Sequence, residues 1–87
     1  MTSFNGAHIR LGSTEMLIVS VRPRILDDHY ECELIRIAFE VRYRVPVVVM
    51  AQDEDGQPRF RGRPKHVAAL RSVKVASLPW SRFQPGG

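Results

Sequence analysis

The stretch from Ile35 to Val45 reads Ile-Arg-Ile-Ala-Phe-Glu-Val-Arg-Tyr-Arg-Val. Its odd positions are all apolar or aromatic, and positions 36, 40, 42 and 44 are charged. Successive side chains of a strand point to opposite faces of a sheet, so this alternation is typical of a strand with one buried face. A helix would place Leu34, Ile37 and Val41 together but would send Ile35 and Phe39 elsewhere. We therefore predict a strand.

The residues that follow predict a β-hairpin. Pro46 marks a bend, because proline cannot donate a ladder hydrogen bond. Val47–Met50 is a short apolar run typical of a buried strand, and Asp53–Gly56 is an acidic turn in which Gly56 supplies a positive φ. Arg59–Arg61 then returns as a short strand beside residues 47–51.

Upstream of this stretch we expect a single strand. Residues 1–8 are expected to be a loose terminus, and Met16–Val21 is rich in β-branched residues and is stopped by Pro23. Leu26–Glu33 is a polar connection, in which a short helical turn begins at Asp27 or Asp28.

Downstream we expect one helix from Pro64 to Val73, with Pro64 at the first helical position. Val67, Leu70 and Val73 would face the core, Lys74–Leu78 would form a last strand, and residues 81–87 a flexible tail. The predicted fold is α+β: a small, mostly antiparallel sheet of four to five strands, with one short helix near 64–73.

Length and composition limit the molecule further. The 87 residues suffice for one domain, 1–87, and not for two. Cys32 is the single cysteine, so no internal disulfide forms, and a reducing, cytoplasmic location is the expectation. The longest apolar run, Val45 to Ala51, is too short to cross a bilayer, so no membrane partner is expected.

Charge is distributed unevenly along the chain. Residues 1–56 hold all nine acids and six of the thirteen Lys and Arg residues, whereas residues 57–87 hold seven cations and no acid. Such a division suits an anionic partner, and it equally suits neutralisation of the acidic first half within the fold or in a dimer.

Motifs for catalysis, metals and cofactors give no candidate, and we expect none of the three. The cluster Asp27–Glu33 combines carboxylates, His29 and Cys32, and we interpret it as an acidic surface turn. Cys32 is predicted to be a small buried hydrophobe. Trp80 is expected to cap the core.

The basic segment around Gly62 is the candidate site. Cationic side chains surround the start of the expected helix, where free backbone N–H groups favour a phosphate. The candidate phosphate-binding residues are Arg59, Arg61, Arg63, Lys65, His66 and Arg71. The alternative is that these cations pair with Asp53, Glu54 and Asp55 across the hairpin.

The stretch from Val45 to Pro79 resembles the core of the ParB/sulfiredoxin-like superfamily. Pro46–Val49 corresponds to the first strand, Asp53–Gly56 to the turn, Gly62 to the glycine of the Gly-x-Arg-Arg box and Ala68-Ala69 to its alanines, with Pro64 and Lys65 where the family has paired arginines. The family's cysteine is absent, since position 63 is Arg. The resemblance implies a nucleotide-binding or nuclease-type domain and a helix over residues 28–42, where the alternation predicts a strand.

Three functions follow from these observations. The first is a non-enzymatic nucleic-acid-associated accessory protein that binds phosphates through the basic segment. The second is a homo-oligomeric structural or interaction module, because a long strand over 34–50 invites pairing with a second copy. The third is the ParB-like nucleotide-binding or nuclease-type domain.

Overall fold

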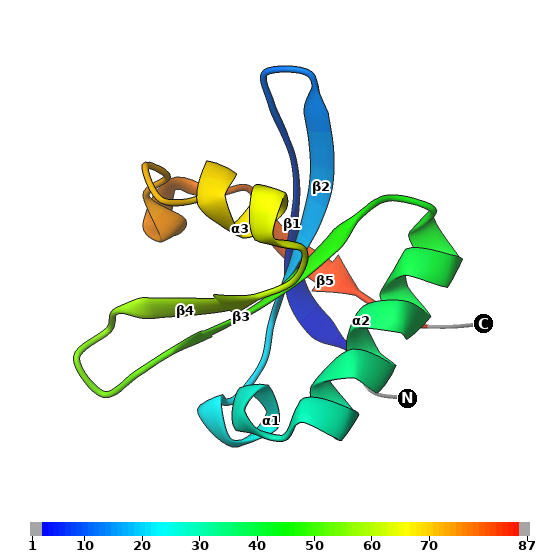
Figure 1. Ribbon diagram of the computed structural model, residues 1–87, viewed down its shortest axis with the longest axis vertical. Helices are drawn as coiled ribbons and strands as arrows, with labels where there is room; N and C mark the ends of the chain where they lie inside the picture. Colours follow the sequence, from blue (N-terminus) through cyan, green and yellow to red (C-terminus); the bar gives the residue numbers. More distant parts are fainter. Residues whose placement is uncertain (1–2, 86–87) are drawn as a thin grey trace.

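The computed structural model describes residues 3–85 and shows an α+β domain built on a five-stranded sheet (Figure 1). The strands lie in the order β4-β3-β2-β1-β5. Their bounds are Phe4–Leu11 (β1), Thr14–Ser20 (β2), Val47–Gln52 (β3), Pro58–Arg61 (β4) and Trp80–Phe83 (β5). The β2–β3 pair is parallel and the other three pairs are antiparallel, which makes the sheet mixed.

Helices cover both faces of this sheet. They are α1 (Pro23–Asp27), α2 (His29–Tyr43) and α3 (Pro64–Ala69), followed by the 3-10 turn η1 (Val75–Ser77). The helices α1 and α2 connect the parallel strands β2 and β3, and a parallel pair requires such a crossover. In the described part of the chain, no helix is long and apolar enough to span a membrane.

The two central strands are buried on both sides. Leu17 and Val19 of β2 pack beneath Phe39 of α2, whereas Met16 and Ile18 face Leu70 at the end of α3. Strand β3 repeats this division, and its residues Val47–Ala51 are all fully or almost fully buried. Strands covered on both faces need continuous apolar runs, which explains the sequences of β2 and β3.

The strand predicted over residues 35–45 is wrong, because residues 29–43 form the helix α2. The helix is apolar on two opposite sides: Phe39 is fully buried, whereas Ile37 and Val41 are 48% and 72% exposed. Residues four apart share a side of a helix. Inner positions 35, 39 and 43 therefore alternate with outer positions 37 and 41, and together they imitate the period of a strand.

Local signals explain why α2 forms. The Asp28 carboxylate accepts the N–H of Glu31 at 3.0 Å and so caps the first turn. The expected helical start at Asp28 is thus confirmed, but the expected polar connection over Leu26–Glu33 is wrong, because Leu26 is buried in α1 and the turn opens a helix of 15 residues. Arg36 bonds Glu33 and Glu40, three and four residues away on the same side of the helix.

Residues 1–8 and 81–87 were predicted to be loose, and this is wrong for residues 4–8 and 81–83, which lie in strands, whereas residues 1–2 and 86–87 lie outside the described part of the chain. Phe4–Leu11 is the strand β1, and Trp80–Phe83 is the strand β5 that pairs with it from Phe4 to Ala7. The Tyr43 hydroxyl donates to the Gln84 carbonyl at 2.9 Å and accepts the Gln84 N–H at 3.2 Å, which fastens β5 to the end of α2.

The predicted strand over Lys74–Leu78 is also wrong. Val75–Ser77 is a 3-10 turn, in which Val75 and Leu78, three residues apart, both pack on the core. The Trp80 indole donates to the Val75 carbonyl at 2.9 Å and packs against the same cluster, so its predicted core role is confirmed. The helix after Pro64 is confirmed, but it ends at Ala69 rather than near Val73.

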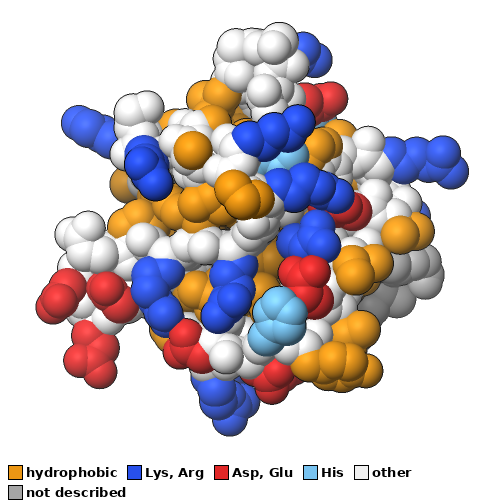
Figure 2. All heavy atoms as spheres, in the orientation of Figure 1, with side chains coloured by type: hydrophobic (Ala, Val, Ile, Leu, Met, Phe, Trp, Pro, Cys, Tyr) orange, Lys and Arg blue, Asp and Glu red, His pale blue; other side chains and the backbone are white. Residues whose placement is uncertain are grey.

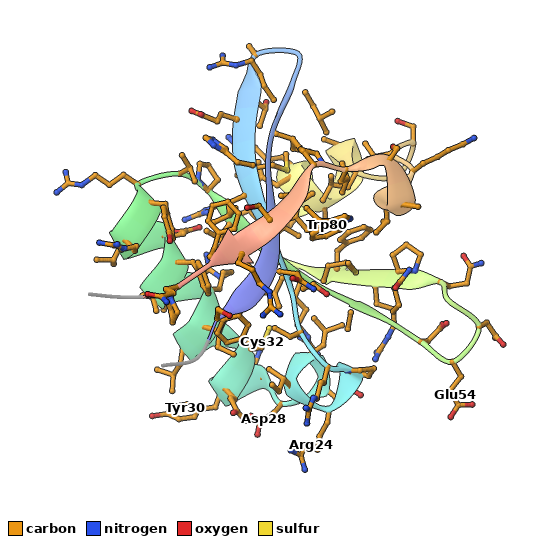
Figure 3. All side chains as sticks on the ribbon, turned by 180° about the vertical axis from the view of Figure 1, so that it is seen from behind. Arg24, Asp28, Tyr30, Cys32, Glu54 and Trp80 are labelled. Atoms are coloured by element: carbon orange, nitrogen blue, oxygen red, sulfur yellow. The ribbon has the colours of Figure 1, made fainter. Side chains whose placement is uncertain are left out.

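The hairpin of β3 and β4 is confirmed. Its turn is closed by Asp53, whose carboxylate accepts the N–H groups of Asp55 and Gln57, and Gly56 has a φ of 80°. The expected strand Met16–Val21 corresponds to β2. Cys32 of α2 (Figure 3) is fully buried against Leu26 of α1 and Val49 and Ala51 of β3, which confirms its role as a small hydrophobe.

Candidate functional site

The six predicted phosphate-binding residues do not form one open site. Phe60 packs into the core on the α3 side, so the neighbouring Arg59 and Arg61 share the opposite face of β4, as alternation requires. Arg63 precedes α3, Lys65 and His66 lie in its first turn, and Arg71 follows it.

Two of the six cations are already paired with carboxylates. Arg59 donates to Asp27 at 2.9 Å, and Arg63 donates to Glu40 through both terminal nitrogens at 2.5 and 3.0 Å. The alternative to a free phosphate site named the hairpin acids as partners, but α1 and α2 supply these carboxylates instead. Within residues 3–85, no ion pair engages Arg61, Lys65 or Arg71.

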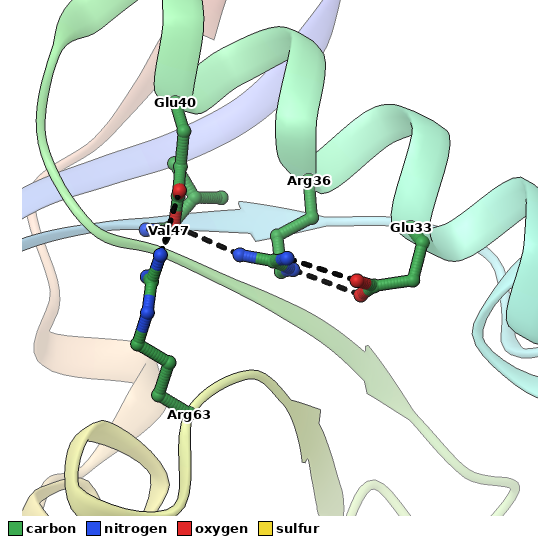
Figure 4. A network of polar contacts seen from close by, with 5 residues as sticks. All are labelled: Glu33, Arg36, Glu40, Val47 and Arg63. Carbon is green, nitrogen blue, oxygen red and sulfur yellow. Dashed lines mark hydrogen bonds and ion pairs between the residues drawn. The ribbon is translucent and has the colours of Figure 1, made fainter.

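Glu40 is the centre of a network that joins α2, β3 and the loop before α3 (Figure 4). Its Oε2 accepts from Arg36 at 2.9 Å, from Arg63 and from the Val47 N–H at 3.0 Å. The Arg63 hydrogen bond is the largest cause that lowers the pKa of Glu40, and burial opposes it. Arg36 is held on its other side by two 2.8 Å bonds to Glu33.

His66 is not an exposed phosphate ligand. It is 3% exposed, and its Nδ1 has no hydrogen-bond partner among the described residues. Burial, followed by the charges of Lys65 and Arg63, lowers the pKa of this imidazole. A neutral ring in a cationic surrounding adds no positive charge to the site.

The start of α3 offers little backbone for an anion. Pro64 has no N–H, and the N–H groups of His66 and Val67 both donate to the Arg63 carbonyl. In this first turn only the Lys65 N–H has no partner within the described chain. The backbone at the start of α3 therefore offers one N–H to the predicted phosphate, and side chains would have to supply the other contacts.

Two adjoining grooves nevertheless lie beside the basic segment. The Arg61 groove is lined by His29, Glu33, Arg36, Phe60, Arg61, Gly62, Arg63, Pro64 and Val67. The Lys65 groove is lined by Glu40, Arg44, Val45, Pro46, Arg63, Lys65 and His66. Arg63 lines both, so the two grooves meet at its side chain.

We call the cations of these grooves the basic face: Arg36, Arg44, Arg61, Arg63 and Lys65. The acids there, Glu33 and Glu40, are bonded to Arg36 and Arg63, which leaves Arg44, Arg61 and Lys65 unmatched within the described chain. Lys and Arg side chains gather on this face over β4, α3 and the end of α2 (Figure 2). Sequence reasoning missed Arg36 and Arg44, since it placed both on a strand.

A larger groove lies between α1, α2 and the ends of β1 and β2. Arg22, Arg24 and Arg82 border it, and its floor is apolar, with Phe4 and Ile25 among the lining residues. Arg82 also donates to the Ser3 hydroxyl at 2.9 Å. Glu31 also lines this groove, which we call the competing groove because its three arginines are the other cluster of cations beside a groove.

Comparison with known proteins adds no family to this picture: no family model, curated protein or solved structure matches the chain. Among the described residues, no group of three or more His, Cys, Asp or Glu side chains could hold a metal ion.

Proposed function

We propose that this chain is a non-enzymatic nucleic-acid-associated accessory protein, in which Arg44, Arg61 and Lys65 of the basic face bind backbone phosphates. The supporting observation is that these three exposed cations remain unmatched after the nearby carboxylates have been bonded by Arg36 and Arg63. Arginine and lysine bind phosphate oxygens through charge-assisted hydrogen bonds.

The internal ion pairs serve this proposal rather than oppose it. Glu40 fixes Arg63 between the two grooves and Glu33 fixes Arg36, so the unmatched cations are carried on an ordered surface. Contacts to backbone phosphates contribute affinity but do not distinguish one base sequence from another. We expect binding that is indifferent to sequence and strongly dependent on salt.

Fluorescence anisotropy with labelled single-stranded DNA, duplex DNA and RNA tests the proposal. For three phosphate contacts, raising the salt from about 50 mM to about 200 mM should weaken duplex binding roughly forty-fold. The triple variant Arg44→Gln/Arg61→Gln/Lys65→Gln should remove most of the affinity and flatten the salt dependence.

The matched control is Arg22→Gln/Arg24→Gln/Arg82→Gln, which removes the same charge from the competing groove. It should keep a much larger part of the affinity than the first triple variant. If the control loses more affinity, or if the unmodified protein binds no nucleic acid at low salt, the proposal is wrong.

A ParB-like nucleotide-binding domain is a second candidate, favoured by the position of α2. The resemblance implies a helix over residues 28–42, and α2 occupies His29–Tyr43 directly before β3. Gly62, the glycine of the box, lies so near β3 that an added Cβ would be 3.2 Å from a Val48 methyl carbon. Calorimetry with nucleoside triphosphates, with and without magnesium, tests this candidate, and heat that disappears in Lys65→Gln would support it.

A further inference from the structure

The helix α2 has an apolar side that its own domain does not cover. Tyr30, Leu34, Ile37 and Val41 are 74%, 52%, 48% and 72% exposed, and they are the large hydrophobic residues that lie most open to solvent in the described chain. The tyrosine projects away from the helix in Figure 3, and hydrophobic side chains gather over α2 in Figure 2. We call these four residues the outer stripe.

The spacing of the outer stripe is that of a helix–helix seam. Its members follow one another at intervals of four, three and four residues, so they form one line along the helix surface. The opposite side of α2 is fixed on the sheet by Cys32 and Phe39. The helix is thus already folded, so binding of a partner would not be weakened by the loss of conformational entropy that accompanies helix formation.

Charges beside the outer stripe distinguish the two directions in which a second helix can lie. Glu31 and Arg42 are eleven residues apart, close to three turns of 3.6 residues, and therefore flank the stripe on the same side. In the described structure neither side chain forms an ion pair. On the other flank, Glu33 and Glu40 are neutralised by Arg36 and Arg63.

We propose that the outer stripe binds the same stripe of a second copy of this chain, with the two α2 helices antiparallel. A two-fold axis between positions 35 and 36 places Tyr30 against Val41 of the partner subunit and Leu34 against Ile37 of the partner subunit. The same axis sets Glu31 beside Arg42 of the partner subunit, twice in the dimer. A parallel pair would instead turn the flank with Glu31 and Arg42 toward the other flank of the second copy, whose carboxylates are already bonded to Arg36 and Arg63.

The size of the stripe predicts a reversible dimer. A helix of 15 residues is about 22 Å long. One face of so short a helix buries less area than the roughly 800 Å² that each partner buries in a standard interface. We expect association that depends on protein concentration rather than a permanent dimer. This inference is independent of the basic face.

Sedimentation equilibrium tests the dimer directly. From about 10 µM to about 1 mM protein, the mass should rise from the monomer toward the dimer. The monomer mass is 9.9 kDa. Leu34→Glu should stay monomeric throughout, whereas the control Ser72→Glu, also at an exposed position, should associate like the unmodified chain.

Charge reversal tests the direction of the helices and does not rely on an apolar substitution. Glu31→Lys and Arg42→Glu should each weaken the dimer about ten-fold, because each reversal replaces two attractive pairs by two repulsive ones, and Glu31→Lys/Arg42→Glu in one chain should restore it. Circular dichroism should show the same helix content in every variant. A protein that is monomeric over the whole range, or single reversals that associate as well as the unmodified chain, would overturn the proposal.

Discussion

Arg63 and Glu40 connect the loop before α3 to the C-terminal half of α2 through paired hydrogen bonds of 2.5 and 3.0 Å. The carboxylate is 19% exposed and also accepts from Arg36 and from the Val47 N–H. One side chain therefore joins elements from both faces of the sheet. Its removal would leave the Arg63 guanidinium and the Val47 N–H without an acceptor, whereas Arg36 would keep its two bonds to Glu33.

Glu40→Gln should destabilise the domain by about 1–3 kcal/mol, because a neutral amide cannot replace the carboxylate for these donors. Urea unfolding followed by circular dichroism measures the change. Glu54→Gln, at the exposed tip of the hairpin, is the matched control and should change the free energy of unfolding by less than about 0.5 kcal/mol. Equal effects of the two variants would contradict the central position of Glu40.

Acid should remove stability through the same group. The pKa of Glu40 is lowered from its ordinary 4.5 by the Arg63 hydrogen bond, and that of Glu33 is lowered by the Arg36 hydrogen bond. Since the folded pKa lies below the unfolded one, the stabilisation is present above pH 4.5 and is lost as the pH falls through the folded value.

Urea unfolding between about pH 7 and pH 3 measures this loss. The loss should be smaller in Glu40→Gln, in which the titrating group is absent. A variant that loses as much stability as the unmodified chain would show that other groups control acid unfolding.

Gly6→Ala should loosen the pairing of β1 with β5. A Cβ at position 6 would lie 2.7 Å from a ring carbon of Phe83, so the ring must move out of its packed position. We expect a loss of about 1–3 kcal/mol and faster hydrogen exchange in Trp80–Phe83. Ser81→Ala, at the exposed position paired with Gly6, should leave exchange in β5 unchanged.

Cys32 should be inert to thiol reagents in the folded protein. The thiol is fully buried, and burial is the largest cause that raises its pKa, so the reactive thiolate is both rare and inaccessible. Ellman's reagent should react only as urea unfolds the chain, whereas the added thiol of Ser72→Cys should react at once. Rapid reaction of Cys32 in the native protein would contradict its burial.

The sequence was sufficient for the elements in which one local pattern was unambiguous. The hairpin of β3 and β4, with Gly56 at its turn, and the proline start of α3 were predicted correctly, because each depends on residues adjacent in the chain. Helix α2 was missed, because hydrophobic residues on two opposite sides of a helix produce the alternation of a strand. The Arg36 pairs at three and four residues were the signal that favoured a helix.

The candidate site was predicted only in part, because its charge pairs are formed between segments that are distant in the sequence. The basic segment lies on the surface, but the acids that bond Arg59 and Arg63 come from α1 and α2 rather than from the nearby hairpin. Arg44 joins the site because the left-handed end of α2, with a φ of 57°, brings it to the Lys65 groove. No pattern in the sequence indicated that position.

The order of the strands has a consequence for synthesis on the ribosome. Among the described strands, β1 is translated before all the others and its outer neighbour β5 after them, so one edge of β1 has no partner while the intervening elements are translated. An open edge is where nascent chains pair with one another. Newly made chains are therefore expected to associate through this edge of β1 until β5 pairs with it.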